Sequence, residues 1–325
     1  MRFTLTDEQR GFAAALTDLL SGADVPAATR AWARDEPDAG LALWRRLAEQ
    51  GVCGLAVPEE AGGLGASPVD LCVAFEALGR SGVPGPWVES AAYLPALLSD
   101  PDALGRLADG EVGTVAVPPL VPRALDAAVA SQVYVVQGTT VSTARLGATH
   151  DSVDPARRLV EVDAADPVAE VDASALERAF DQAVLAVSAQ LLGLGEHLLA
   201  TTVTYVKQRR QFGREIGSYQ ALKHQLADVR IALDFARPLV LGAAVTFDGS
   251  VSVRSRDVSA ARVRVGDAAY LAARTALQLH GAIGYTEEHD LSLAILKVRA
   301  LVGTWGGAAF HRARVLEALT VAADA

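Results

Sequence analysis

The 325-residue chain has little cysteine, lysine and methionine, and aromatic residues make up only 6% of it. Its two cysteines, Cys53 and Cys72, are isolated and far from CxxC spacing, so the sequence predicts no disulfide framework, zinc site or other metal centre. The longest uncharged run, residues 127–144, is interrupted by serine, threonine and glutamine, which argues against a membrane span. The N-terminus has acidic residues too early for a signal peptide and no cleavage-like site, so we expect a cytoplasmic protein.

The net charge of −10 is unevenly distributed along the chain. Residues 1–172 contain 12 basic and 25 acidic residues, a balance of −13, whereas residues 173–325 contain 17 and 14, a balance of +3. A mildly basic C-terminal half suits a nucleotide-like anion such as the pyrophosphate of coenzyme A or a flavin. The balance is far too weak to predict nucleic-acid binding.

Hydrophobic periodicity predicts a mostly α protein in three parts. Residues 1–111 form an N-terminal helical domain that begins after a Thr6 N-cap, residues 112–172 hold the strand-like material, and residues 173–325 form a four-helix bundle. Prolines limit the first strand, within 112–119, to a short or edge position. The other expected strands lie within 133–141 and 157–163. The expected helices lie near 7–21, 40–50, 68–80, 88–99, 174–211, 217–247, 254–281, 288–301 and 304–321.

The stretch around which the chain is organised runs from residue 204 to 229 and reads TYVKQRRQFGREIGSYQALKHQLADV. It predicts a helix ended by Gly213, a tight corner, and a second helix with Ser218 at its N-cap. The corner gathers Arg209, Arg210, Gln211 and Phe212 in one place. These residues suit either a solvated helix end, where arginine favours the C-terminal dipole, or a site for an anion and a ring.

Three segments of the sequence resemble the acyl-CoA dehydrogenase family of flavoenzymes, which oxidise acyl-CoA thioesters to 2-enoyl-CoA. They are the R-x-Q-F-G-x-x-I-G-x-Y-Q run within 207–229, the QLHGAIGYTEE run of 278–288, and the GLAVPEEAGGLG run of 54–65, which is expected to be structural. The resemblance implies contacts with the adenosine and pyrophosphate of an FAD held by a neighbouring subunit. The residues it assigns to this role are Arg209, Gln211, Phe212, Gln278, Gly281 and Ala282, the last replacing a usual glycine.

Two other residues in the second segment, His280 and Glu288, are expected to have structural roles. His280 is interpreted as a half-buried imidazole with satisfied hydrogen bonds, and Glu288 as a residue that pins the loop after the helix. The family's central β-domain is about twice as long as the one expected here. Its flavin-cradling T-E-P-x-x-G-S-D segment is replaced in this chain by AVPPLVPRALD, residues 116–126.

The carboxylate base that the chemistry requires is missing from both places the resemblance offers for it. Gapless counting puts Trp305 at one place, in the loop before the last helix, and Ala183 at the other, on the first long helix. Neither side chain can accept a proton. Asp181 faces another side of the helix because two residues turn it by about 200°, and Glu177 is more than a turn from Ala183.

The leading hypothesis is therefore a chain similar to the non-catalytic subunit of the heteromeric acyl-CoA dehydrogenases of actinobacteria, described for sterol side-chain breakdown. It implies an FAD shared across a subunit interface, an acyl-CoA substrate, a homologous dehydrogenase partner and an electron-transfer acceptor. One alternative is a self-sufficient homo-oligomeric dehydrogenase whose base is an unexpected acid. The other is a flavin-free protein that binds a CoA ester or a protein partner.

Overall fold

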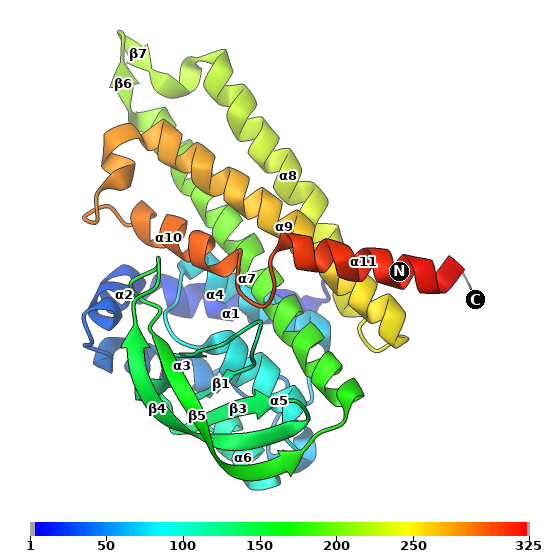
Figure 1. Cartoon of the computed structure of the whole chain (residues 1–325). Helices are drawn as coiled ribbons and strands as arrows, with labels where there is room; N and C mark the ends of the chain where they lie inside the picture. The colour runs from blue at the N-terminus through cyan, green and yellow to red at the C-terminus, as the bar shows by residue number, and fades with distance from the viewer. Residues whose placement is uncertain (1–3, 324–325) are drawn as a thin grey trace.

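The computed structural model describes residues 4–323, in which N-terminal helices and a small sheet lie at one end and a long helical bundle at the other (Figure 1). The N-terminal cap is as predicted: Thr6 accepts a hydrogen bond from the Gln9 N–H in a capping box. The N-terminal helices are α1 (Asp7–Ser21), α2 (Val25–Ala33), α3 (Asp38–Glu49), α4 (Pro68–Ser81), α5 (Leu94–Leu97) and α6 (Pro101–Ala108).

The helices predicted near 7–21, 40–50 and 68–80 are confirmed as α1, α3 and α4. Helices α2 and α6 were not predicted, because with nine and eight residues each is too short to display a clear apolar period. The helix expected over 88–99 is a π-helical turn, Glu89–Tyr93, followed by α5. In the glycine-rich loop, a Cβ on Gly63 would lie 2.1 Å from the Val57 carbonyl oxygen, so this loop packs its backbone tightly and the structural interpretation holds.

The central sheet has the strand order β1-β3-β4-β5-β2, with β1 parallel to β3 and the other pairs antiparallel. As the prolines predict, β1 is four residues long and lies at an edge. The ribbon of β4 and β5 is longer than the sequence indicates, because much of it is solvent-exposed and lacks an apolar pattern. The strands are β1 (Gly113–Ala116), β2 (Ala124–Leu125), β3 (Gln132–Gln137), β4 (Thr140–His150) and β5 (Leu159–Glu170).

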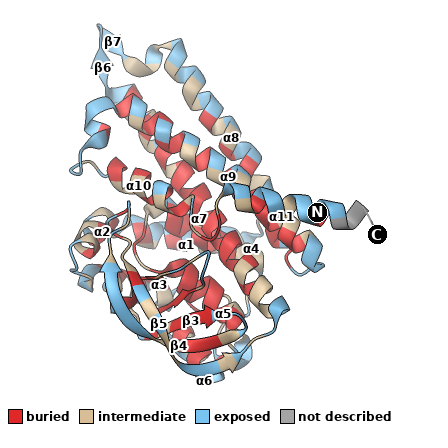
Figure 2. Ribbon diagram, in the orientation of Figure 1, coloured by how far each residue is buried: buried red, intermediate tan, exposed pale blue. Residues whose placement is uncertain are grey.

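The C-terminal region is a bundle built around α7, a 36-residue helix that is buried along most of its length (Figure 2). On one side α7 packs against α4 and on the other against α8 and α9. It is long and apolar enough to cross a membrane, but 89% of its most apolar window is buried inside the fold, as in a core helix. The bundle comprises α7 (Ala173–Gln208), α8 (Gln220–Val245), α9 (Val251–His280), α10 (Leu291–Leu301) and α11 (Ala308–Ala323).

The corner between α7 and α8 differs from the prediction. Helix α7 ends at Gln208, and the chain then forms a β-hairpin of β6 (Arg210–Gln211) and β7 (Arg214–Glu215). Phe212 and Gly213 form its two-residue turn with φ values of 51° and 81°, the pattern of a type I′ turn, so Gly213 turns a hairpin and does not end a helix. Ser218 is not an N-cap either: it lies in a 3-10 turn, where its hydroxyl donates to the Glu215 carbonyl.

Candidate functional site

The hairpin presents three of the predicted cofactor-binding residues to solvent at the outer end of the bundle (Figure 1). Arg209, Gln211 and Phe212 are all exposed, and the Phe212 ring is 89% exposed. Within residues 4–323 the Arg209 guanidinium forms neither a hydrogen bond nor an ion pair, so its donors are available to a ligand. A free guanidinium beside an exposed ring suits recognition of a phosphate and a planar base.

The other three predicted residues lie where α9 ends, and all three are exposed. Gly281 adopts φ 62° and ψ −137°, and a Cβ built on it would meet nothing within 4 Å, so the backbone is open to an approaching ligand. Ala282 follows in a 3-10 turn (Gly281–Tyr285), whereas Gln278 lies in the last turn of the helix. Gly281 therefore ends the helix as predicted, but Gly284 lies within the turn that follows.

An aromatic stack joins these two motifs. The Tyr205 ring, one turn before the hairpin, lies 4.1 Å from the His280 ring with an angle of 21° between the planes. His280 is buried, not half-buried as predicted, and only Nδ1 is hydrogen-bonded, to the Ala276 carbonyl at 2.8 Å. Its Nε2 has no partner in the described part of the chain, and burial lowers its pKa. The stack holds both motifs at the same end of the bundle.

The loop after α9 is pinned by an arginine from the N-terminal region, not by the Glu288 side chain as predicted. Arg30 of α2 donates to the Asp290 carboxylate at 2.7 Å and to the carbonyl oxygens of Glu287 and Glu288 at 3.2 and 3.3 Å. The sequence did not signal this contact, because 260 residues separate the two partners.

Both expected base positions lie inside the protein. Ala183 and Trp305 have no exposed surface. The Trp305 ring lies 4.7 Å from the Tyr93 ring and 6.1 Å from the Phe180 ring, measured between centroids. A catalytic base must reach the proton on the α-carbon of its substrate. Around Trp305, the space that a substrate would need is filled by the aromatic side chains of Tyr93 and Phe180.

A carboxylic acid that the sequence did not indicate contacts Trp305. Glu89 of the π-helical turn is 2% exposed, and its Oε1 accepts a hydrogen bond from the Trp305 indole N–H at 3.3 Å. Burial raises the pKa of Glu89, against the pull of Arg157 and the Trp305 hydrogen bond. The only sequence signal was an acid within the otherwise apolar run WVESAAYLPALL, and nothing in that run links it to a residue 216 positions away.

The two acids near Ala183 on α7 belong to an ion-pair network. Asp181 has no exposed surface and pairs with Arg254 at 2.9 Å and Arg314 at 2.8 Å, and Arg314 also pairs with Glu177 at 3.3 Å. The expectation that Asp181 faces away from Ala183 agrees with these contacts. Arginine donors therefore occupy both carboxylate oxygens of Asp181.

A buried histidine beside Trp305 makes the stability of the fold depend on pH. His311 lies between the Trp305 carbonyl at 2.9 Å and the Ser259 hydroxyl at 3.2 Å, and burial, aided by the nearby Arg262 charge, lowers its pKa to about 4. In the unfolded state the imidazole takes up a proton near pH 6.5, whereas in the folded state it does so only near pH 4. The stability that depends on the neutral imidazole is therefore fully present above pH 6.5 and is lost as the pH falls towards 4. We expect the stability difference between wild type and His311→Gln to shrink by about 3 kcal/mol over this range, measured by urea denaturation at successive pH values. A constant difference would contradict the assignment.

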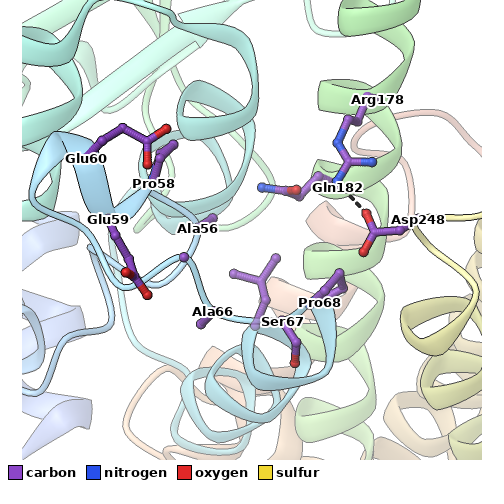
Figure 3. Close-up of a pocket in the computed structure, with 12 residues that line it drawn as sticks. Ala56, Pro58, Glu59, Glu60, Ala66, Ser67, Pro68, Arg178, Gln182 and Asp248 are labelled. Atoms are coloured by element: carbon purple, nitrogen blue, oxygen red, sulfur yellow. Dashed lines mark hydrogen bonds and ion pairs between the residues drawn. The ribbon is translucent and has the colours of Figure 1, made fainter.

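A cavity of about 640 Å³ is lined by residues that belong to neither motif (Figure 3). The glycine-rich loop and the start of α4 form one wall, and the start of α7 and the turn after α8 form the other. Its charged groups are Glu59 and Glu60 on one side and the Arg178–Asp248 ion pair, 2.6 Å, on the other. Three acids against one base disfavour a pyrophosphate here.

The segment that replaces the family's flavin cradle is paired at one point and buried at its C-terminal end. Val117 and Val121 pair as an isolated bridge, and Ala124 and Leu125, which form β2, are 0% and 2% exposed. The exposed donors at the hairpin and the open backbone at the end of α9 are of the kinds that fit the pyrophosphate end of an FAD.

Comparison with known proteins identifies the family of this chain. A model described as "Acyl-CoA dehydrogenase, N-terminal domain" matches residues 6–99, and one described as "Acyl-CoA dehydrogenase, C-terminal domain" matches residues 173–320. The chain belongs to the acyl-CoA dehydrogenase family. Acyl-CoA dehydrogenases are oxidoreductases that act on CH–CH bonds, and membership implies FAD as the cofactor.

This acyl-CoA dehydrogenase is 34% identical over 279 residues to acyl-CoA dehydrogenase IpdE2 of Mycobacterium tuberculosis, a match that covers 82% of the chain and 83% of that protein. Among solved structures, it is similar to the Tcur3481-Tcur3483 steroid ACAD G363A variant (TM-score 0.86, 24% identity, covering 99% and 100% of the two chains). It is also similar to the ChsE4-ChsE5 complex of Mycobacterium tuberculosis (TM-score 0.83, 21% identity, covering 98% and 99%). At these identities the two structures show the fold alone.

Proposed function

We propose that this chain is the non-catalytic subunit of a hetero-oligomeric acyl-CoA dehydrogenase. The observation that carries the proposal is that both positions for the catalytic carboxylate hold buried apolar side chains, Ala183 and Trp305. Neither of these two side chains can remove the α-proton of an acyl-CoA. The α,β-dehydrogenation would then take place on a homologous partner subunit, which passes electrons to an electron-transfer acceptor. Two structural neighbours, the Tcur3481-Tcur3483 protein and the ChsE4-ChsE5 complex, are each named for two proteins, which supports a two-subunit assembly.

The contribution of this chain would be half of an FAD site, shared across the subunit interface. Arg209, Gln211 and Phe212 on the hairpin, and Gln278, Gly281 and Ala282 at the end of α9, would contact the adenosine and pyrophosphate of an FAD held by the partner. When bound, FAD accepts a hydride from the β-carbon of the acyl group. This chain's residues would supply positive charge, a stacking surface and open backbone. We also propose that the chain divides into domains at residues 1–111, 112–172 and 173–325.

The test is co-expression with a homologous dehydrogenase subunit that retains the catalytic glutamate and the T-E-P-x-x-G-S-D segment, followed by size-exclusion chromatography and a flavin absorbance spectrum. We expect a yellow complex with dehydrogenase activity and a colourless chain when this subunit is expressed alone. A yellow and active lone chain would instead support the self-sufficient enzyme. A complex that forms without flavin would support the flavin-free binding protein.

Arg209→Ala is expected to lower the FAD affinity of the complex by about tenfold or more, because a charge-assisted hydrogen bond contributes about 1.5–3 kcal/mol. The measurement is flavin content after dialysis against a range of free FAD concentrations. Arg214→Ala is the matched control, since Arg214 lies on the same hairpin and its guanidinium stacks 3.9 Å from the Tyr219 ring centroid. Equal flavin loss in both variants would contradict a specific role for Arg209.

One observation favours the self-sufficient enzyme as a second candidate. Glu89 is a carboxylic acid in contact with the residue at the expected base position, and π-helical turns such as the one it occupies are frequent at functional sites. A lone chain that dehydrogenates an acyl-CoA and loses this activity as Glu89→Gln would make Glu89 the base. Its burial weighs against this role.

A further inference from the structure

A smaller cavity, of about 280 Å³, lies on the bundle between the middle of α9, the end of α10 and the start of α11. Val263 and Val302 give it an apolar wall, and Tyr270 contributes an aromatic ring. Its charged lining residues are Arg262, Arg299 and Asp267. The volume is close to the lower end of those typical of small-molecule sites, about 300 Å³.

Arg262 is a buried cation that has no acid for a partner. It is 3% exposed, and its Nη2 donates to the carbonyl oxygens of Leu301 at 2.7 Å and Thr304 at 3.1 Å. Within residues 4–323 it forms no ion pair, and burial lowers its pKa to about 10 without opposition from any carboxylate. Buried charges in proteins are normally paired. The two carbonyls fix the guanidinium in place but leave its charge uncompensated.

One end of this guanidinium is still available. Nη1 donates to no acceptor among the described residues and, unlike Nε, is not closed off from the surface. It lies beside Gly266, which also lines the cavity: a Cβ built on that glycine would be 3.1 Å from Nη1. An oxyanion in the cavity would therefore gain a charge-assisted hydrogen bond from a donor that is already held in position.

The other charges at the cavity favour the same kind of ligand. Arg299 is exposed, its Nη1 donates to the Tyr270 hydroxyl at 3.2 Å, and it forms no ion pair in the described part of the chain. Asp267 is the one acid of the lining, and it already pairs with Arg312 at 3.5 Å. The cavity is therefore electropositive, although the whole chain carries a net charge of −10.

We propose that this cavity binds a small organic oxyanion, a carboxylate or a phosphate monoester, whose oxygens accept from Arg262 Nη1 and from Arg299. The apolar part of the ligand packs against Val263 and Val302. None of the lining residues belongs to the two motifs proposed to contact FAD, so the site does not rest on the proposed function.

The test uses four probes that share one ring and differ in charge: benzoate, phenyl phosphate, benzyl alcohol and benzylamine. Each is titrated into the full chain at pH 7.5 and low salt by isothermal calorimetry. We expect at least one of the two anions to bind saturably and at least about tenfold more tightly than the alcohol or the amine, and the tighter anion identifies the headgroup. No saturable binding of either anion, or equal binding of the alcohol or the amine, would overturn the proposal.

Ala308→Glu is the informative variant, and Ala309→Glu is its matched control. Both alanines are exposed in the first turn of α11, where an acid is favourable at a helix N-terminus, but only Ala308 lines the cavity. A carboxylate at position 308 would occupy or repel from the anion site, so the affinity of the bound anion should fall by at least about tenfold. Ala309→Glu makes the same change in net charge and should leave the affinity unchanged. Equal affinities in the two variants would overturn the proposal.

A second pair of variants tests the arginines. Arg299→Ala should lower the anion affinity by about tenfold, because it removes a charge-assisted hydrogen bond. Arg264→Ala, at an exposed position of α9 outside the lining, should not change it. Arg262→Gln should abolish binding, but it also removes the donors to Leu301 and Thr304 and so destabilises the fold. The decision therefore rests on the exposed positions, and full affinity in Arg299→Ala would contradict the site.

Discussion

Trp305→Glu, which places the family's glutamate back in its expected position, is expected to unfold the protein and not to restore a base. Removing a fully buried tryptophan costs about 3–5 kcal/mol, and the variant adds a carboxyl beside the buried Glu89. Two neighbouring acids in an apolar interior cannot both ionise at neutral pH, so the new group would be protonated or would open the structure. The measurement is urea denaturation together with an acyl-CoA dehydrogenase assay using an artificial electron acceptor.

Trp305→Phe is the control for this variant. It keeps an aromatic ring beside Tyr93 and Phe180 but removes part of the indole together with the N–H that donates to Glu89, so the expected loss is about 1–3 kcal/mol. A Trp305→Glu protein as stable as wild type that oxidises an acyl-CoA would show that the aromatic filling can give way to a substrate. That result would remove the main support for the non-catalytic role.

Gly79→Ala is expected to destabilise the protein by about 3 kcal/mol or more, because it forces two helices apart. Gly79 of α4 faces α7, and a Cβ built on it would lie 2.0 Å from the Gln190 carbonyl oxygen. Gly193 makes the reciprocal contact, with its Cβ 2.1 Å from the Glu76 carbonyl oxygen. These obstacles are backbone atoms and cannot move aside as side chains do. Chemical denaturation of the lone chain measures the effect.

Gly11→Ala is the matched control for Gly79→Ala. Gly11 lies inside α1, and a Cβ on it would meet nothing within 4 Å. Alanine there should stabilise the protein by up to about 1 kcal/mol, because it has the higher helix propensity. A Gly79→Ala protein whose stability changes in the same direction as Gly11→Ala would contradict the close packing of α4 on α7.

The sequence predicts the long helices well because their apolar periods are long and each has one clearly buried side. It fails for α2 and α6, which are too short to show a period, and for the corner after α7. There Gly213 fits a helix end as well as a hairpin turn, and only the pairing of Arg210 with Glu215 distinguishes the two. Ser218 has the right chemistry for an N-cap, but the 3-10 turn uses its hydroxyl to bond Glu215.

In the candidate site, too, the sequence predicts the local motifs but not the contacts between residues that are far apart in the chain. The motifs that carry Arg209 and Gln278 are each local in sequence, so the sequence alone is enough to recognise them. The contacts of Glu89 with Trp305 and of Arg30 with Asp290 each join residues more than 200 positions apart, so no local pattern encodes them. No local pattern predicts the burial of His280 either, because its ring stacks on Tyr205 of another helix.

The length of α7 has a consequence for cooperativity. This one helix packs against α4 of the N-terminal region, donates from Gln182 to the Ala92 carbonyl, and continues into the bundle beside α8 and α9. A break anywhere along it would expose the interior of both regions at once. The three proposed domains therefore describe the architecture but not separate units of stability, and the chain should lose its structure in one transition.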